Sequence, residues 1–119
     1  MLRIFTIVLT LCLCLACQQQ LCTPTAPPVD PEITKIGSDF IYLKWNSLGL
    51  EYIYEVVLLS DTITNGGEGT ELRRYTDLFD TAFTINDLKQ ETVYRVKILS
   101  YSNNSLVFGE SPTLRFKTE

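Results

Sequence analysis

The fold is predicted most directly by residues 41–59, which read IYLKWNSLGLEYIYEVVLL. Apolar side chains at Ile41, Leu43 and Trp45 alternate with Tyr42 and Lys44. This period of two is typical of a β-strand with one buried face. Residues 52–59 also have the composition of a strand, and both of their alternating sets are largely apolar. The stretch therefore predicts two strands joined by a loop over 46–50.

Similar segments of strand length continue on both sides of this stretch, with turn residues between them. Further strands are predicted over 31–36, 71–76, 82–86, 93–101 and 114–118. The sequences GSD at 37–39 and NGG at 65–67 are turn signals. Seven short strands at such spacing predict an all-β, two-sheet β-sandwich over residues 30–119.

Composition excludes several classes of function. The chain has 119 residues, enough for one domain, and a net charge of −4, which disfavours binding to nucleic acid. It contains no histidine, so Ser–His and Cys–His nucleophiles and imidazole-bound zinc are excluded. Asp77 and Asp80 are too few ligands for calcium, which takes six to eight oxygens. We therefore expect no enzyme activity, no cofactor and no metal site.

Residues 1–17, MLRIFTIVLTLCLCLAC, have the layout of a secretory signal peptide. Arg3 precedes an apolar run over 4–15, and the small residue Ala16 follows it. The run is too short for a transmembrane helix, which needs about 20 apolar residues. We therefore expect the protein to be exported.

The four cysteines, at positions 12, 14, 17 and 22, all lie in or just after this segment. The stretch LCLAC at 13–17 resembles a bacterial lipoprotein signal, in which a peptidase cuts before a lipid-modified cysteine. Ala16 fits the small residue before the cut, whereas Cys14 stands where leucine is usual. The resemblance implies that Cys17 is lipidated. The alternative is an ordinary signal-peptidase cut and free secretion.

Residues 18–29, QQQLCTPTAPPV, are rich in Gln, Thr and Pro and offer little to bury. This composition predicts an extended linker, which would reach at most about 37 Å at roughly 3.1 Å per residue. A lipid on Cys17 would then hold the domain just clear of the headgroups.

Three features of residues 30–119 resemble the fibronectin type III family. The first two are alternating strand motifs, I-x-L-x-W at 41–45 and Y-x-V-x-L at 54–58, and the third is LKQETVY at 88–94. The resemblance implies that Trp45 anchors the core and that Tyr54 lies in the next strand. It also implies a tyrosine corner, in which the Tyr94 hydroxyl bonds to the preceding loop while Leu88 closes that end of the core.

The resemblance implies a binding module or a spacer, since the fold does not choose between them. One candidate binding surface is the tip of the loop over 102–109, with Leu106, Val107 and Phe108. The alternative, which we favour, is that these residues extend the hairpin and pack down. A second candidate is an outward sheet face with Leu99 and Tyr101, in company with Val57 and Leu59. Its apolar content suggests a partner or self-association.

Together these features predict a non-enzymatic, exported protein, lipid-anchored at the cell envelope. It would present one fibronectin type III-like module for binding a protein or a glycan. The alternative is a secreted or anchored structural spacer that has no ligand of its own.

Overall fold

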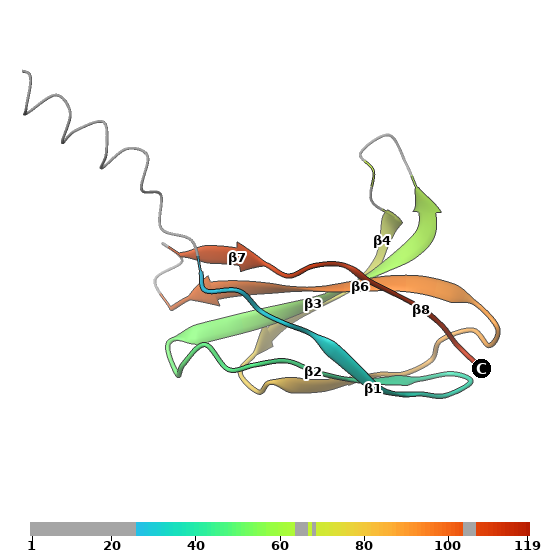
Figure 1. The fold of residues 1–119 in the computed structure, drawn as a ribbon, viewed down its shortest axis with the longest axis horizontal. Coiled ribbons are helices and arrows are strands. Elements are labelled where there is room, and N and C mark those ends of the chain that lie inside the picture. The colour runs from blue at the N-terminus through green and yellow to red at the C-terminus, as the bar shows by residue number, and fades with distance from the viewer. Residues whose placement is uncertain (1–25, 64–66, 68, 104–106) are drawn as a thin grey trace, which may run out of the picture.

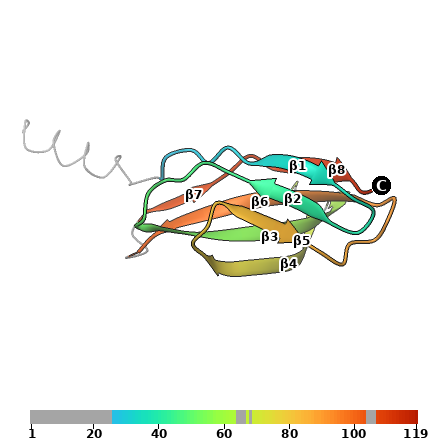
Figure 2. The same cartoon turned by 90° about the horizontal axis from the view of Figure 1, so that it is seen from below.

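The computed structural model describes residues 26–63, 67, 69–103 and 107–119. The signal segment and residues 18–25 of the expected linker therefore lie outside the described residues. The described part is all-β, and its eight strands are shown in Figure 1 and, from below, in Figure 2. They are β1 (Glu32–Ile36), β2 (Ile41–Lys44), β3 (Tyr52–Ile63), β4 (Gly69–Leu78), β5 (Ala82–Ile85), β6 (Val93–Ser102), β7 (Phe108–Glu110) and β8 (Leu114–Lys117).

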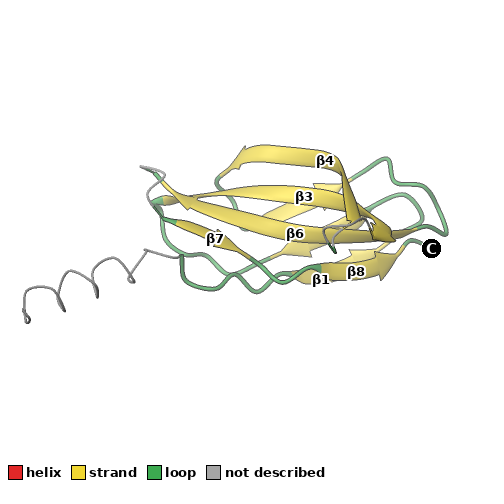
Figure 3. Cartoon of the chain, turned by 90° about the horizontal axis from the view of Figure 1, so that it is seen from above, coloured by secondary structure: helices red, strands yellow, loops and turns green. Residues whose placement is uncertain are grey.

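The strands form two packed antiparallel sheets (Figure 3), which confirms the predicted β-sandwich. The smaller sheet has the order β1-β2-β5. The larger sheet has the order β4-β3-β6-β7, and β8 also pairs with β6. The stretch 41–59 contributes β2 to the smaller sheet and most of β3 to the larger one, so the loop between them joins the two layers.

The last strand region differs from the prediction, which had one strand where the structure has two. β7 pairs with β6 from Leu99 to Tyr101, and β8 pairs with it from Val93 to Val96. Ser111 bridges the interruption, because its N–H donates to the Ile98 carbonyl and its Oγ accepts from the Ile98 N–H, each at 2.8 Å. The hydroxyl thus continues the ladder just before Pro112, which has no N–H to offer.

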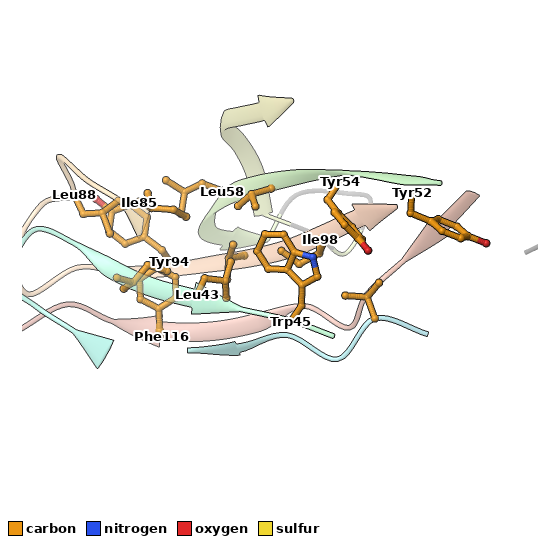
Figure 4. Packing of buried hydrophobic residues seen from close by; sticks show 14 residues of the cluster. Leu43, Trp45, Tyr52, Tyr54, Leu58, Ile85, Leu88, Tyr94, Ile98 and Phe116 are labelled. Atoms are coloured by element: carbon orange, nitrogen blue, oxygen red, sulfur yellow. The ribbon is translucent and has the colours of Figure 1, made fainter. Parts of the chain in front are cut away.

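The main core fills the space between the sheets (Figure 4). Trp45 packs edge-on against Tyr54, with ring centroids 5.5 Å apart. The Tyr54 hydroxyl accepts a hydrogen bond from the Leu48 N–H at 2.9 Å. Both aromatic side chains are buried, as are Leu88 and Tyr94 at the opposite end of the cluster. Aromatic rings from both layers therefore pack against each other and stabilise the contact between the two sheets.

Tyr94 forms the corner that the resemblance implies. Its hydroxyl accepts a hydrogen bond from the Lys89 N–H at 2.9 Å, and its ring stacks on Phe116. Arg73 adds a clamp that the sequence did not indicate, because its guanidinium donates to the carbonyls of Asn86 and Asp87. Asp87 has a φ of 57°, which lies in the left-handed region. The hydrogen bonds from the Arg73 guanidinium and from the Lys89 N–H help to hold this turn.

The end of the linker expected over 18–29 differs from the prediction. Val29 is buried in the main core, although 18–29 was expected to be a free tether. The Ala26 N–H donates to the Phe108 carbonyl at 3.1 Å, and Asn46 bonds to the backbone of both Pro28 and Asp30. Because Val29 has an apolar side chain and a core to enter, Pro27 and Pro28 run along the domain.

Candidate binding surfaces

The outward face of the larger sheet holds a second, smaller apolar cluster. Val57, Leu59 and Leu99 form it, and Tyr101 packs against them. These side chains were expected to be exposed to a partner, but Leu99 is only 6% exposed and Val57 is completely buried. The expectation of an open apolar face is therefore corrected.

Strand register explains what covers this cluster. Val57 lies between Arg74 on β4 and Lys97 on β6, and Leu99 lies between Glu55 on β3 and Glu110 on β7. Cross-strand partners share a face of the sheet, so each apolar side chain is flanked by long charged ones. The aliphatic stems of such side chains cover apolar surface while their charged ends stay in water.

The covering charges are paired with one another. Lys97 Nζ lies 2.6 Å from Glu110 Oε1. Arg74 bridges Glu55 at 3.5 Å and Glu71 at 2.7 Å. The pairs hold the stems in place over the apolar cluster, so this face is a closed secondary core with a polar surface.

Asp61 extends this ion-pair layer along β3. Arg115 Nε lies 2.9 Å from Asp61 Oδ1, and Arg95 Nε lies 3.1 Å from the same oxygen. The hydrogen bonds from Arg115 and then Arg95 hold the pKa of the Asp61 carboxyl below its usual range. The carboxylate therefore stays ionised between its two arginines.

The outward face of the smaller sheet is different, because it carries exposed aromatic surface. Tyr42 is 43% exposed, and its ring lies 5.1 Å from that of Phe40. Lys35 Nζ lies 5.7 Å from the centroids of both rings, within the range of a cation–π contact. A shallow hollow of about 330 Å³ beside them is lined by Tyr42, Lys44 and Thr84 among others. The sequence pattern indicated Tyr42 only as an alternating residue, and its outward place in a half-buried strand was the signal for this surface.

The expected loop tip is divided between the core and the surface. Val107 is half-buried against the main core, and its N–H donates to Ser102 Oγ at 3.1 Å. Phe108 is 45% exposed, and its ring lies 5.2 Å from that of Tyr101. Leu106 lies outside the described residues. Val107 thus packs down, as the favoured alternative held, whereas Phe108 remains available for contact.

In the part of the chain that the structure describes, no group of three or more acidic or cysteine side chains is placed to hold a metal ion. The same residues include no helix long and apolar enough to cross a membrane.

No family model matches the chain, and no curated protein matches it. Solved structures do match. The fibronectin type III domain of human fibronectin type III domain containing protein 3 superimposes with a TM-score of 0.60 and 23% identity, over 80% of this chain and 85% of that one. The fold is that of a fibronectin type III domain.

A second structure with the fibronectin type III fold, the FN5 domain of Drosophila Lar, has a TM-score of 0.59 and 17% identity. It is covered over 97% of its length, by 79% of this chain. A structure described as a myokine has a TM-score of 0.61 and 16% identity, with 80% of this chain covering 97% of that one. At these identities the likeness shows the fold alone.

Proposed function

We propose that this chain is a non-enzymatic, exported protein, anchored at the cell envelope by a lipid on Cys17. In this proposal its single fibronectin type III module binds a protein or a glycan. The sequence of residues 1–17 supports export and anchoring, and the fold supports a binding module. A spacer without a ligand is the alternative.

The observation that carries the binding half of the proposal is the aromatic pair formed by exposed Tyr42 and half-buried Phe40. It lies on an outward sheet face, whereas the corresponding face of the larger sheet is closed by ion pairs. Tyrosine is enriched at interfaces because its ring supplies contact area while its hydroxyl accepts and donates hydrogen bonds. We therefore propose the face around Tyr42 as the partner-binding surface.

The anchoring half is tested with Cys17→Ser. The serine has no thiol to accept a lipid, so we expect the variant to move from the membrane fraction to the soluble fraction on cell fractionation. Cys22→Ser is the matched control and should stay with the membranes. A Cys17→Ser protein that still sediments with membranes contradicts the lipid anchor.

The binding half is tested by placing a photo-crosslinking amino acid at position 42 in the cell-envelope protein. We expect one discrete adduct from position 42 and none from position 72, because Leu72 is similarly exposed but lies on the edge strand β4. The adduct should be lost when Phe40→Ala is added. Absence of any adduct at position 42 favours the spacer.

A further inference from the structure

Three exposed apolar side chains lie at the same end of the sandwich. Five large hydrophobic side chains are exposed among the described residues, and Leu50, Phe79 and Phe108 are three of them. Leu50 is fully exposed and Phe79 is 70% exposed. They come from the loop before β3, the turn after β4 and the start of β7, and Figure 1 shows these segments at the same end.

Strand pairing places these segments at the same end of the larger sheet, with β4 and β7 at its two edges. Tyr52 at the start of β3 pairs with Ser102, Tyr54 pairs with Leu78 at the end of β4, and Tyr101 pairs with Phe108. We call Leu50, Phe79 and Phe108 the apolar end. Large apolar side chains that stay exposed at one end of a domain are candidates for a contact site.

The N-terminal segment joins the domain at this same end. The Ala26 N–H donates to the carbonyl of Phe108, so the chain reaches the sandwich beside one of the three side chains. Eight residues, 18–25, separate Ala26 from Cys17. The nine steps from Cys17 to Ala26 reach at most about 28 Å at roughly 3.1 Å per residue, so a lipid on Cys17 would hold the apolar end close to the bilayer.

We propose that the apolar end docks on the surface of the lipid bilayer, with Leu50, Phe79 and Phe108 at the boundary between headgroups and acyl chains. The inference rests on the proposed anchor at Cys17. Phenylalanine and leucine are the apolar residues that interfacial protein segments bury at this depth. The tether makes the contact intramolecular, so an effective concentration in the millimolar range lets three side chains suffice.

The charged residues at this end indicate which lipid headgroups the apolar end would contact. Glu51 follows Leu50 and Asp80 follows Phe79, so attraction to anionic lipid cannot drive the docking. We expect docking on zwitterionic phosphatidylcholine and little change when salt is raised. Docking by this end would leave the face around Tyr42 free, since that face lies on the side of the sandwich.

The test places one tryptophan reporter at the apolar end and one away from it. Leu50→Trp and Leu72→Trp proteins are reconstituted in phosphatidylcholine vesicles whose acyl chains carry bromine, which quenches tryptophan at short range. Trp45 is buried in both proteins and contributes the same background. We expect the emission added by Trp at position 50 to fall about twofold or more, and that at position 72 to change little.

A second arm separates docking from anchoring. If the protein from cells does not float with vesicles, the anchor has failed, and Cys17 of the chain from residue 17 onward, with Cys22→Ser, is coupled to a maleimide phospholipid instead. Quenching at position 50 in this coupled protein supports docking whatever happens in cells. Equal quenching at positions 50 and 72 in the coupled protein overturns the proposal, whether both are strong or both weak.

The quenching must also depend on the neighbouring side chains. Adding Phe79→Ser and Phe108→Ser to the Leu50→Trp protein should reduce its quenching to the level seen at position 72. Both replaced side chains are exposed, so the fold is expected to survive. Undiminished quenching in this variant overturns the assignment of the apolar end as the docking surface.

Discussion

Replacing Trp45 with alanine is expected to destabilise the domain by about 3–5 kcal/mol, the range for truncating a buried tryptophan. Trp45 is buried directly after β2 and contacts Tyr54 of the other sheet at a ring-centroid distance of 5.5 Å. Its loss removes that contact and leaves a cavity between the layers. The total stability of a small domain is on the order of 5–15 kcal/mol, so the variant would be close to unfolding.

Urea unfolding followed by circular dichroism measures this loss. Trp45→Phe is the matched control, because it keeps an aromatic ring against Tyr54. The indole Nε1 has no hydrogen-bond partner among the described residues, so removing it breaks no bond that the structure shows. We expect the phenylalanine variant to lose less than half as much stability. A loss below about 1 kcal/mol for Trp45→Ala would contradict the packing described for this ring.

Leu99→Glu is expected to destabilise the domain by about 3 kcal/mol, because it buries a charge without a partner. Leu99 is 6% exposed and lies in register between Glu55 and Glu110. The new carboxylate would therefore meet like charges on both neighbouring strands, which adds repulsion to the cost of burial. Leu99→Lys is the matched control, since its ammonium would face the same two carboxylates and we expect a smaller loss.

Sedimentation of the wild type and of Leu99→Glu shows whether this face is a closed secondary core or an interface between copies of the chain. A closed secondary core predicts a wild type that does not associate through the face and a variant that unfolds at lower urea. An interface between copies predicts an oligomeric wild type and a stable, monomeric Leu99→Glu. The second pair of results would contradict the closed core.

Local patterns in the sequence were sufficient to predict the β-sandwich. Alternation in 41–45 and 52–59 predicts strands without reference to the rest of the chain, because the side-chain period of a strand is a local property. The strand at 108–110 was missed because three residues around Gly109 carry no such alternation. Gly109 is nevertheless constrained, since a Cβ there would lie 2.7 Å from Ala26 Cβ and from Ser100 Oγ. That constraint comes from distant parts of the chain.

The residue pattern and the family resemblance predict a β-sandwich with Trp45, Tyr54 and Tyr94 in its core. What the surfaces of the domain present follows from the long-range strand pairing. Alternation placed Leu99 on an outward face, but the register with Glu55 and Glu110 decided that the face is covered. Leu50, Phe79 and Phe108 are far apart in the sequence, and antiparallel pairing brings their three segments to one end of the domain. Burial and neighbourhood depend on long-range pairing, which a local pattern does not contain.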